Sequence, residues 1–184
     1  MKSIIPVKVF VSAAVVSLAF FAVPAFAQKN TALSDAEVAS VAVVANQIDI
    51  NYGEIARKKS KNPEVLRFAE TMIRDHKAVI AQASALVKKL GVTPKSNAVS
   101  KKLLADAATT TKTLNSRSGK AFDRVYIDNE VAYHKAVISA VEGLLIPEAD
   151  NKELKDLLTN VVPALKAHLD HAIMVQGHLS NKND

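Results

Sequence analysis

The sequence predicts an all-α protein built around a four-helix bundle. Four long segments carry apolar residues at spacings of three and four, the pattern of a helix with one buried face. No segment alternates apolar and polar residues as a half-buried strand does, and helix start and stop signals bracket the four segments. We therefore expect a single helical-bundle domain over residues 34–180, with long helices over about 34–60, 63–90, 120–145 and 151–179.

The first 27 residues have the pattern of a secretory signal peptide. Lys2 and Lys8 give a basic start, residues 9–23 are almost wholly apolar, and Ala25-Phe26-Ala27 is a small-x-small cleavage site. We expect cleavage after Ala27, a flexible N-terminus over 28–33, and a periplasmic or secreted protein. The apolar run is shorter than the roughly 20 residues of a membrane span, and no later segment is uniformly apolar. The sequence thus predicts no transmembrane segment after cleavage.

Composition and charge narrow the classes of partner. The formal net charge is +6, of which Lys2 and Lys8 contribute two, so the mature chain carries only +4. This balance does not favour nucleic-acid binding, and the basic clusters lie near predicted helix ends, where cations complement the helix dipole. An anionic envelope surface or a homo-oligomer stays open as a partner. Because the chain has no cysteine, no disulfide can stabilise it.

The first two helices form a predicted hairpin. Ser34 and Glu37 form a capping box that starts the first helix, which should end near Ser60. Asn62 is expected to cap the second helix with Pro63 at its first position, and Gly91 gives a stop signal.

The second half of the chain begins with a less regular segment. A short helix over about 100–114 is expected inside this crossover connection. The fourth helix should then be broken by Pro147, and Pro163 should kink or split the fifth.

Three histidines interrupt the apolar stripes of three different long helices. They are His76, His134 and His168, and each takes a position that the apolar spacing assigns to the buried face. At 1.5 Å per residue they lie roughly 20 to 26 Å along their helices, so antiparallel packing brings them to one level. The sequence therefore predicts a buried polar layer at the middle of the bundle, and such a layer needs partners or a ligand.

Imidazole and carboxylate groups that project inward from several helices can bind a transition-metal ion. The candidate ligands are His76, His134 and His168, with Glu54 and Glu130 as further carboxylates. Asp75, Asp170 and His171 are the candidate partners that would orient these ligands.

Two other interpretations of the layer stay open. Neutral histidines can pack in the core and bond to nearby polar side chains, or the layer can bind a small organic ligand or a partner surface. No phosphate-binding loop, nucleophile elbow or other local catalytic motif occurs. The leading hypothesis is a periplasmic, non-enzymatic bundle that binds one transition-metal ion. The alternatives are a metal-dependent redox enzyme and an envelope stress or interaction module with purely structural histidines.

Several segments of the mature chain carry motifs of a known family: N-Y-G-E-I-A from Asn51, N-P-E-V-L-R-F-A-E-T-M-I-R-D-H from Asn62, F-D-R-V-Y from Phe122, His134, and L-K-A-H-L from Leu165. Together they resemble the domain-of-unknown-function 4142 family of secreted or periplasmic bacterial proteins. The resemblance covers roughly the whole mature chain and implies a ferritin-like bundle. It marks Glu54, Asp75, His76, His134 and His168 as motif positions without assigned roles, and the ferritin-like kinship strengthens the metal hypothesis.

The sequence departs from a ferritin-like di-iron centre in one respect. Such centres use the motif Glu-x-x-His on two helices. In this sequence Ile73 and Val131 stand three residues before His76 and His134, where the motif has glutamate, and Glu130 stands four residues before His134. We therefore expect a single metal ion and not a carboxylate-bridged di-iron centre.

Overall fold

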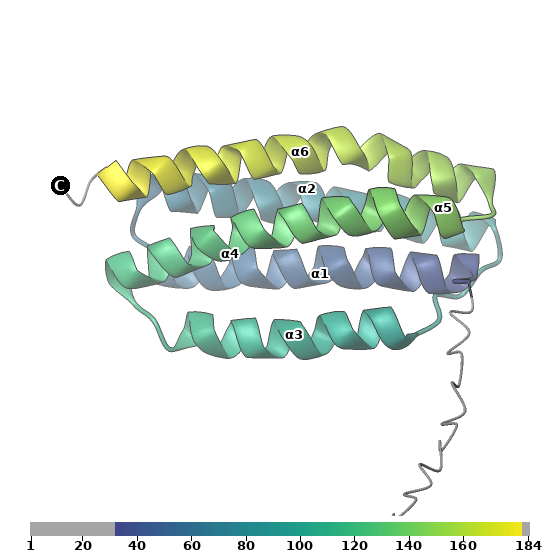
Figure 1. Cartoon of the computed structure of the whole chain (residues 1–184), viewed down its shortest axis with the longest axis horizontal. Coiled ribbons are helices and arrows are strands. Elements are labelled where there is room, and N and C mark those ends of the chain that lie inside the picture. The colour runs from purple at the N-terminus through teal and green to yellow at the C-terminus, as the bar shows by residue number, and fades with distance from the viewer. Residues whose placement is uncertain (1–31, 182–184) are drawn as a thin grey trace, which may run out of the picture. The chain divides into compact units, whose positions relative to one another are not determined.

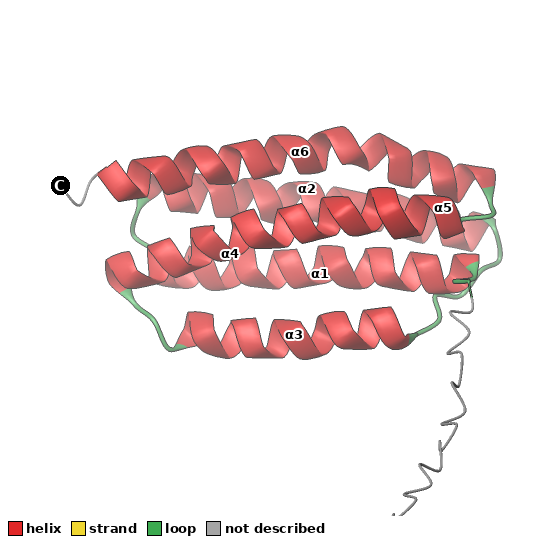
Figure 2. Ribbon diagram, in the orientation of Figure 1, coloured by secondary structure: helices red, strands yellow, loops and turns green. Residues whose placement is uncertain are grey.

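The computed structural model describes residues 32–181, and every regular element among them is a helix (Figures 1 and 2). The elements are α1 (Asp35–Lys59), α2 (Pro63–Lys89), α3 (Ala98–Asn115), α4 (Gly119–Ala140), the π-helical turn η1 (Val141–Leu145), α5 (Ile146–Glu148) and α6 (Lys152–Asn181). The predicted all-α class is confirmed. The expected signal peptide over 1–27 and the expected cleavage after Ala27 lie outside the described residues.

Four long helices form the bundle and α3 lies outside it. Helix α1 packs against α2, α3 and α4, while α6 packs against α2 and α4. In Figure 1, α2 and α4 run in one direction and α1 and α6 in the other, so neighbours in the bundle are antiparallel. Helix α3 brings the chain back along the outside between α2 and α4, which is the crossover with a short extra helix that the sequence predicts.

The helix starts use the capping residues that the sequence indicates. The Ser34 N–H donates to the Glu37 carboxylate at 3.1 Å at the start of α1, and the Asn62 side chain accepts from the Glu64 N–H at 2.9 Å at the start of α2. Gly91 follows α2 with a φ of 64°, a left-handed conformation that glycine adopts without strain. Among residues 32–181, no helix combines the length and the apolar composition needed to cross a bilayer.

Both Pro147 and Pro163 lie within helical segments. Pro147 does not break the chain's helical path, because a π-helical turn precedes it and the path continues to Glu148. The wider turn replaces the ordinary hydrogen bonding that proline cannot complete. Pro163 does not split α6, which is continuous from Lys152 to Asn181 and arched in Figure 1. Both Pro163 and Thr159, whose carbonyl would have accepted a bond from residue 163, are exposed, so water can satisfy that carbonyl.

Helices α1 and α2 pack tightly beside Gly53. A Cβ atom at this position would lie 2.9 Å from Ile73 Cγ1 and 3.1 Å from the Ala69 carbonyl oxygen. Glycine is therefore required here by the space between two helices and not by the backbone conformation.

The core divides into two apolar clusters. The Phe68 cluster is built from Ile48, Tyr52, Ala56, Val65, Phe68, Ala69, Met72, Leu114, Phe122, Tyr126, Ile127, Val131, Ala172 and Val175. The Leu158 cluster is built from Val38, Val41, Ile138, Val141, Leu145, Ala149, Leu154, Leu158, Val162 and Leu165. On α4, buried His134 lies between Val131 of the Phe68 cluster and Ile138 of the Leu158 cluster, and on α6, buried His168 lies between Leu165 and Ala172. On α2, buried His76 follows Met72, the last α2 residue of the Phe68 cluster. The polar layer thus lies between two apolar ends of one bundle.

Candidate metal centre

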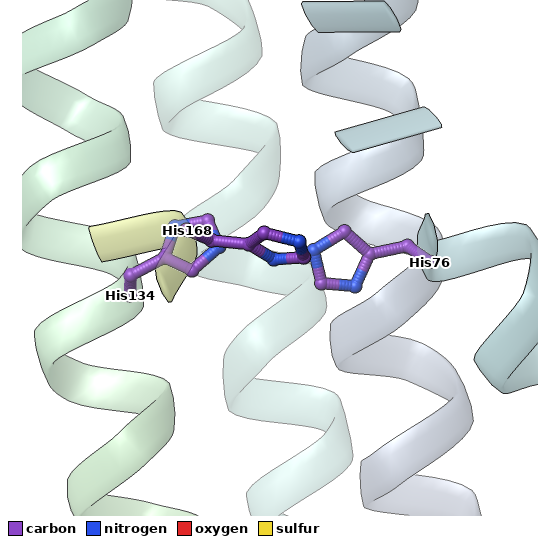
Figure 3. Close-up of side chains that lie close together, drawn as sticks. All are labelled: His76, His134 and His168. Carbon is purple, nitrogen blue, oxygen red and sulfur yellow. The ribbon is translucent and has the colours of Figure 1, made fainter. Parts of the chain in front are cut away.

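The three predicted histidines meet in the core. His76 comes from α2, His134 from α4 and His168 from α6, and each side chain is less than a tenth exposed. The ring centroids lie 5.8 Å apart for His76 and His134, 5.3 Å for His76 and His168, and 5.5 Å for His134 and His168. One ring nitrogen of each lies within 4.8 Å of the other two. Figure 3 shows the rings at one level across the bundle, pointing toward one another.

The outer nitrogen of His76 is held by Asn46 on α1. His76 Nδ1 lies 2.7 Å from Asn46 Oδ1, and the Asn46 amide nitrogen donates to the Ala42 carbonyl at 2.8 Å. Because the second bond fixes which amide atom faces the imidazole, His76 Nδ1 must carry the hydrogen and donate it. The lone pair of a neutral His76 therefore lies on Nε2 and faces the centre.

The other two imidazoles are oriented in the same way. His134 Nδ1 lies 3.0 Å from the backbone carbonyl oxygen of Glu130. Because a carbonyl oxygen can only accept a hydrogen bond, His134 Nδ1 carries the hydrogen and His134 Nε2 carries the lone pair. His168 Nε2 lies 3.0 Å from Asp75 Oδ2, so His168 Nδ1 carries the lone pair. Outer acceptors that fix the tautomer and the ring orientation are typical of histidines that bind metal ions.

Asp49 completes the inner face of the layer. Its carboxylate is fully buried, with Oδ2 3.1 Å from His76 Nε2 and 3.5 Å from His134 Nε2. Neither Asp49 oxygen has a hydrogen-bond partner, nor do the inward nitrogens of the three histidines. With neutral imidazoles, the centre therefore collects three nitrogen lone pairs and a carboxylate with no donor among them. Such a set is stabilised by a cation or by an added proton.

The charges around Asp49 also favour a positive charge beside its carboxylate. Burial works to raise the pKa of Asp49, but the interactions of its carboxylate with the protonated imidazoles of His76, His134 and His168 together outweigh burial and hold this pKa below its ordinary value. Burial lowers the pKa of both His134 and His168, so both imidazoles favour the neutral state in which a metal ion can bind them. The layer is thus built to hold an ionised Asp49 beside a positive charge.

Glu130 lies at the edge of this centre. It is fully buried, its oxygens lack hydrogen-bond partners, and its Oε2 lies 3.7 Å from His134 Nδ1. Burial and the negative charge of Asp49 raise the pKa of Glu130 well above its ordinary value, which makes it a neutral acid. Asp49, Glu130 and His134 also offer ligand atoms within 4.8 Å of one another. This group shares His134 with the three histidines, and the outer nitrogen of His134 is already occupied. The two groups therefore overlap at His134.

Three predicted residues are not brought to the centre. Glu54 pairs with Arg57 Nη2 at 2.5 Å and lies 3.7 Å from Lys77 Nζ at the bundle surface, because its position on α1 faces outward there. Asp170 is exposed. His171 packs its ring against Phe68, with centroids 5.1 Å apart, and so faces away from His168. Asp75, by contrast, contacts His168 directly.

Sequence reasoning missed Asp49 and Asn46. The distance of Asp49 from the start of its helix places it at the level of the histidines. It stands beside the apolar stripe of the first helix and not on it. Helix α1 has three neighbours, so Ile48, Asp49 and Ile50 are all buried and its inner face is wider than one stripe.

Comparison with known proteins identifies the family. The family described as "Domain of unknown function (DUF4142)" matches residues 22–175, which is most of the chain. The chain belongs to the DUF4142 family. A comparison with curated proteins gives no significant match for this DUF4142 chain.

Solved structures similar to this DUF4142 chain share its helical fold. One is described as "Crystal structure of putative secreted protein DUF305 from Streptomyces coelicolor", with a TM-score of 0.68 and 14% identity over 79% of this chain and 93% of that one. Another is "CopM in the Cu(II)-bound form", with a TM-score of 0.61 and 16% identity over 79% of this chain and 98% of that one. At these identities the likeness extends to the fold alone.

Proposed function

We propose that this DUF4142 protein binds one transition-metal ion through His76, His134, His168 and Asp49, as a non-enzymatic metal-binding protein of the bacterial envelope. The single observation that carries the proposal is the orientation of the imidazoles. Each outer nitrogen donates to a fixed acceptor, so three lone pairs converge beside a buried carboxylate. A cation satisfies all four groups at once.

The donor set narrows the choice of metal. Imidazole nitrogen suits Zn²⁺, Cu²⁺, Ni²⁺ and iron, and three histidines with one carboxylate match the four ligands that Zn²⁺ prefers. The described residues bring no thiolate to the centre, because the chain has no cysteine. Copper belongs in the same test, since CopM, which shares the fold, has a Cu(II)-bound form.

The location rests on the first 27 residues. A basic start, an apolar run and Ala25-Phe26-Ala27 support export and cleavage, which would place the bundle where envelope metal ions reach it. The structurally similar DUF305 protein is described as a putative secreted protein. A ferritin-like kinship agrees with a site at the centre of four helices.

Metal loading of the mature protein tests the proposal. Protein stripped with a chelator is incubated separately with Zn²⁺, Cu²⁺, Ni²⁺ and Fe²⁺, desalted, and measured by elemental analysis. We expect one tightly bound ion per chain for at least one metal, and loss of that ion in His76→Ala, His134→Ala and His168→Ala. His178→Ala is the matched control, because His178 is exposed and pairs with Glu64 outside the layer.

Two results would overturn this assignment. Wild-type protein that retains no stoichiometric ion, while circular dichroism shows an intact bundle, would rule out metal binding. Metal-dependent turnover of oxygen or peroxide that requires the same histidines would make the protein a redox enzyme instead.

A further inference from the structure

A cavity adjoins the histidine layer on the side of the Leu158 cluster. Its volume is about 260 Å³, and its walls come mainly from aliphatic side chains of α1, α2, α4 and α6, with α3 on one side. Several lining residues are alanines, among them Ala83 on α2, Ala140 on α4 and Ala164 on α6, and their small side chains leave space that larger ones would fill. For comparison, an engineered apolar cavity of about 150 Å³ binds benzene.

The cavity has one polar end. Asp49, His76, His134 and His168 all line it, and the atoms they turn inward are the acceptors without hydrogen-bond partners. Exposed Asp106 and Ala136 also line it, so part of the cavity reaches the surface. A ligand of this cavity therefore meets aliphatic walls along its body and a cluster of acceptors at one end.

We propose that the metal-free protein binds a small primary amine with an apolar body. The ammonium group lies in the histidine layer and the hydrocarbon body fills the cavity. An ammonium group has three donors and no acceptor, which matches the three inward imidazole nitrogens and leaves its charge beside Asp49. An anionic head would face the carboxylates of Asp49 and Asp75, and a ligand without a polar head would leave the acceptors unpaired.

This inference uses the acceptors of the proposed metal site but does not depend on metal binding. Because the ammonium group and a metal ion would use the same lone pairs, the two ligands exclude each other. Saturation with whichever metal binds should abolish binding of the amine.

Calorimetric titration of chelator-stripped mature protein with 2-phenylethylamine tests the proposal. We expect saturable binding, at least tenfold weaker binding of ethylbenzene, which lacks the head, and of methylamine, which lacks the body, and no binding of phenylacetate. Ala83→Leu, which fills the cavity from α2, and Asp49→Asn should each weaken binding of the amine at least tenfold. Ala85→Leu, an exposed position on the same helix outside the cavity lining, should leave it unchanged.

The outcomes separate this inference from the metal assignment. Absence of amine binding by a folded protein that loads metal would overturn the inference alone, as would binding that Ala83→Leu leaves unchanged while circular dichroism shows a folded variant. Amine binding by a protein that loads no metal would support it while overturning the metal assignment.

Discussion

Asp49 Oδ2 lies 3.1 Å from His76 Nε2, yet the bond that His76 Nδ1 makes to Asn46 leaves a neutral His76 no hydrogen to offer Asp49. Two buried acceptors at this separation repel each other unless a positive charge lies beside them. The pair therefore requires a cation or an added proton, and the first of four predictions concerns Asp49.

Asp49→Asn should weaken metal binding about a hundredfold or more. The variant keeps the shape of the side chain and removes its charge and one ligand oxygen, a larger loss than the 10- to 100-fold effect of removing a group that orients a ligand. Isothermal titration calorimetry with the metal that loads the wild type measures the change. Glu54→Gln is the matched control on the same helix and should bind as the wild type does, because Glu54 pairs with Arg57 and Lys77 outside the centre. A stronger effect at Glu54 would restore the ligand set expected from the sequence.

Asp75→Asn should weaken metal binding about 10- to 100-fold without removing a ligand, since Asp75 holds the outer nitrogen of His168. The amide can present either its oxygen or its nitrogen to His168 and has no charge to increase the basicity of the imidazole. Asp170→Asn, an exposed change two residues from His168, should have no effect. Equal affinities for the wild type and Asp75→Asn would show that His168 is oriented by packing alone.

Glu130→Gln should change how the stability of the metal-free bundle depends on pH. Burial raises the pKa of Glu130 in the folded protein, so the folded state holds this proton more tightly than the unfolded state does. The contribution of Glu130 to stability therefore falls as the pH rises above the ordinary value of 4.5, by about 1.4 kcal/mol per pH unit, until the pH reaches the folded pKa. The glutamine variant has no ionisable group at this position. The difference in free energy of unfolding between the variant and the wild type should therefore grow in favour of the variant as the pH rises.

Urea denaturation of both proteins at about pH 5 and about pH 7 measures that difference. Glu142→Gln, an exposed carboxylate paired with Lys166, serves as the control and should show no growing advantage. Parallel stability profiles for the wild type and Glu130→Gln would contradict a neutral buried acid at this position.

Gly53→Ala should destabilise the bundle by about 1 to 3 kcal/mol, the usual cost of an added methyl group in a tightly packed interior. The new Cβ would meet the Ala69 carbonyl at 3.1 Å, and a backbone atom cannot move aside as a side chain can. Gly177→Ala on α6 has open space around it and should be neutral or stabilising by up to about 1 kcal/mol. Equal stability gains at both positions, measured by urea denaturation, would show that α1 and α2 can separate freely.

The histidine layer could be predicted because each histidine replaces an apolar residue in a regular stripe, and helix length then fixes its depth. Asp49 could not be predicted in this way, because it stands beside the apolar stripe of α1, and its place at the centre depends on contacts with His76 on α2 and His134 on α4. Asn46 is missed for the same reason, since its role depends on a contact with a helix 30 residues away. Glu54 is a carboxylate at a family motif position, but its direction around α1 pairs it with surface cations.

The prolines show the opposite limit of sequence reasoning. Local chemistry correctly says that Pro147 and Pro163 each remove a backbone hydrogen bond, but it does not say where the freed carbonyl will find another partner. A π-helical turn before Pro147 and solvent beside Pro163 compensate for the missing hydrogen bonds, and both depend on the surroundings of the helix.

The polar layer divides the core into two ends that should differ in how readily they unfold locally. The Phe68 cluster is filled by aromatic rings, whereas the Leu158 cluster borders the cavity. Backbone amides at the cavity end should therefore exchange with solvent through smaller, more frequent openings than amides at the aromatic end. A cation held by α1, α2, α4 and α6 together would tie the two ends into one cooperative unit, so that occupancy of the centre becomes visible in the exchange of amides far from it.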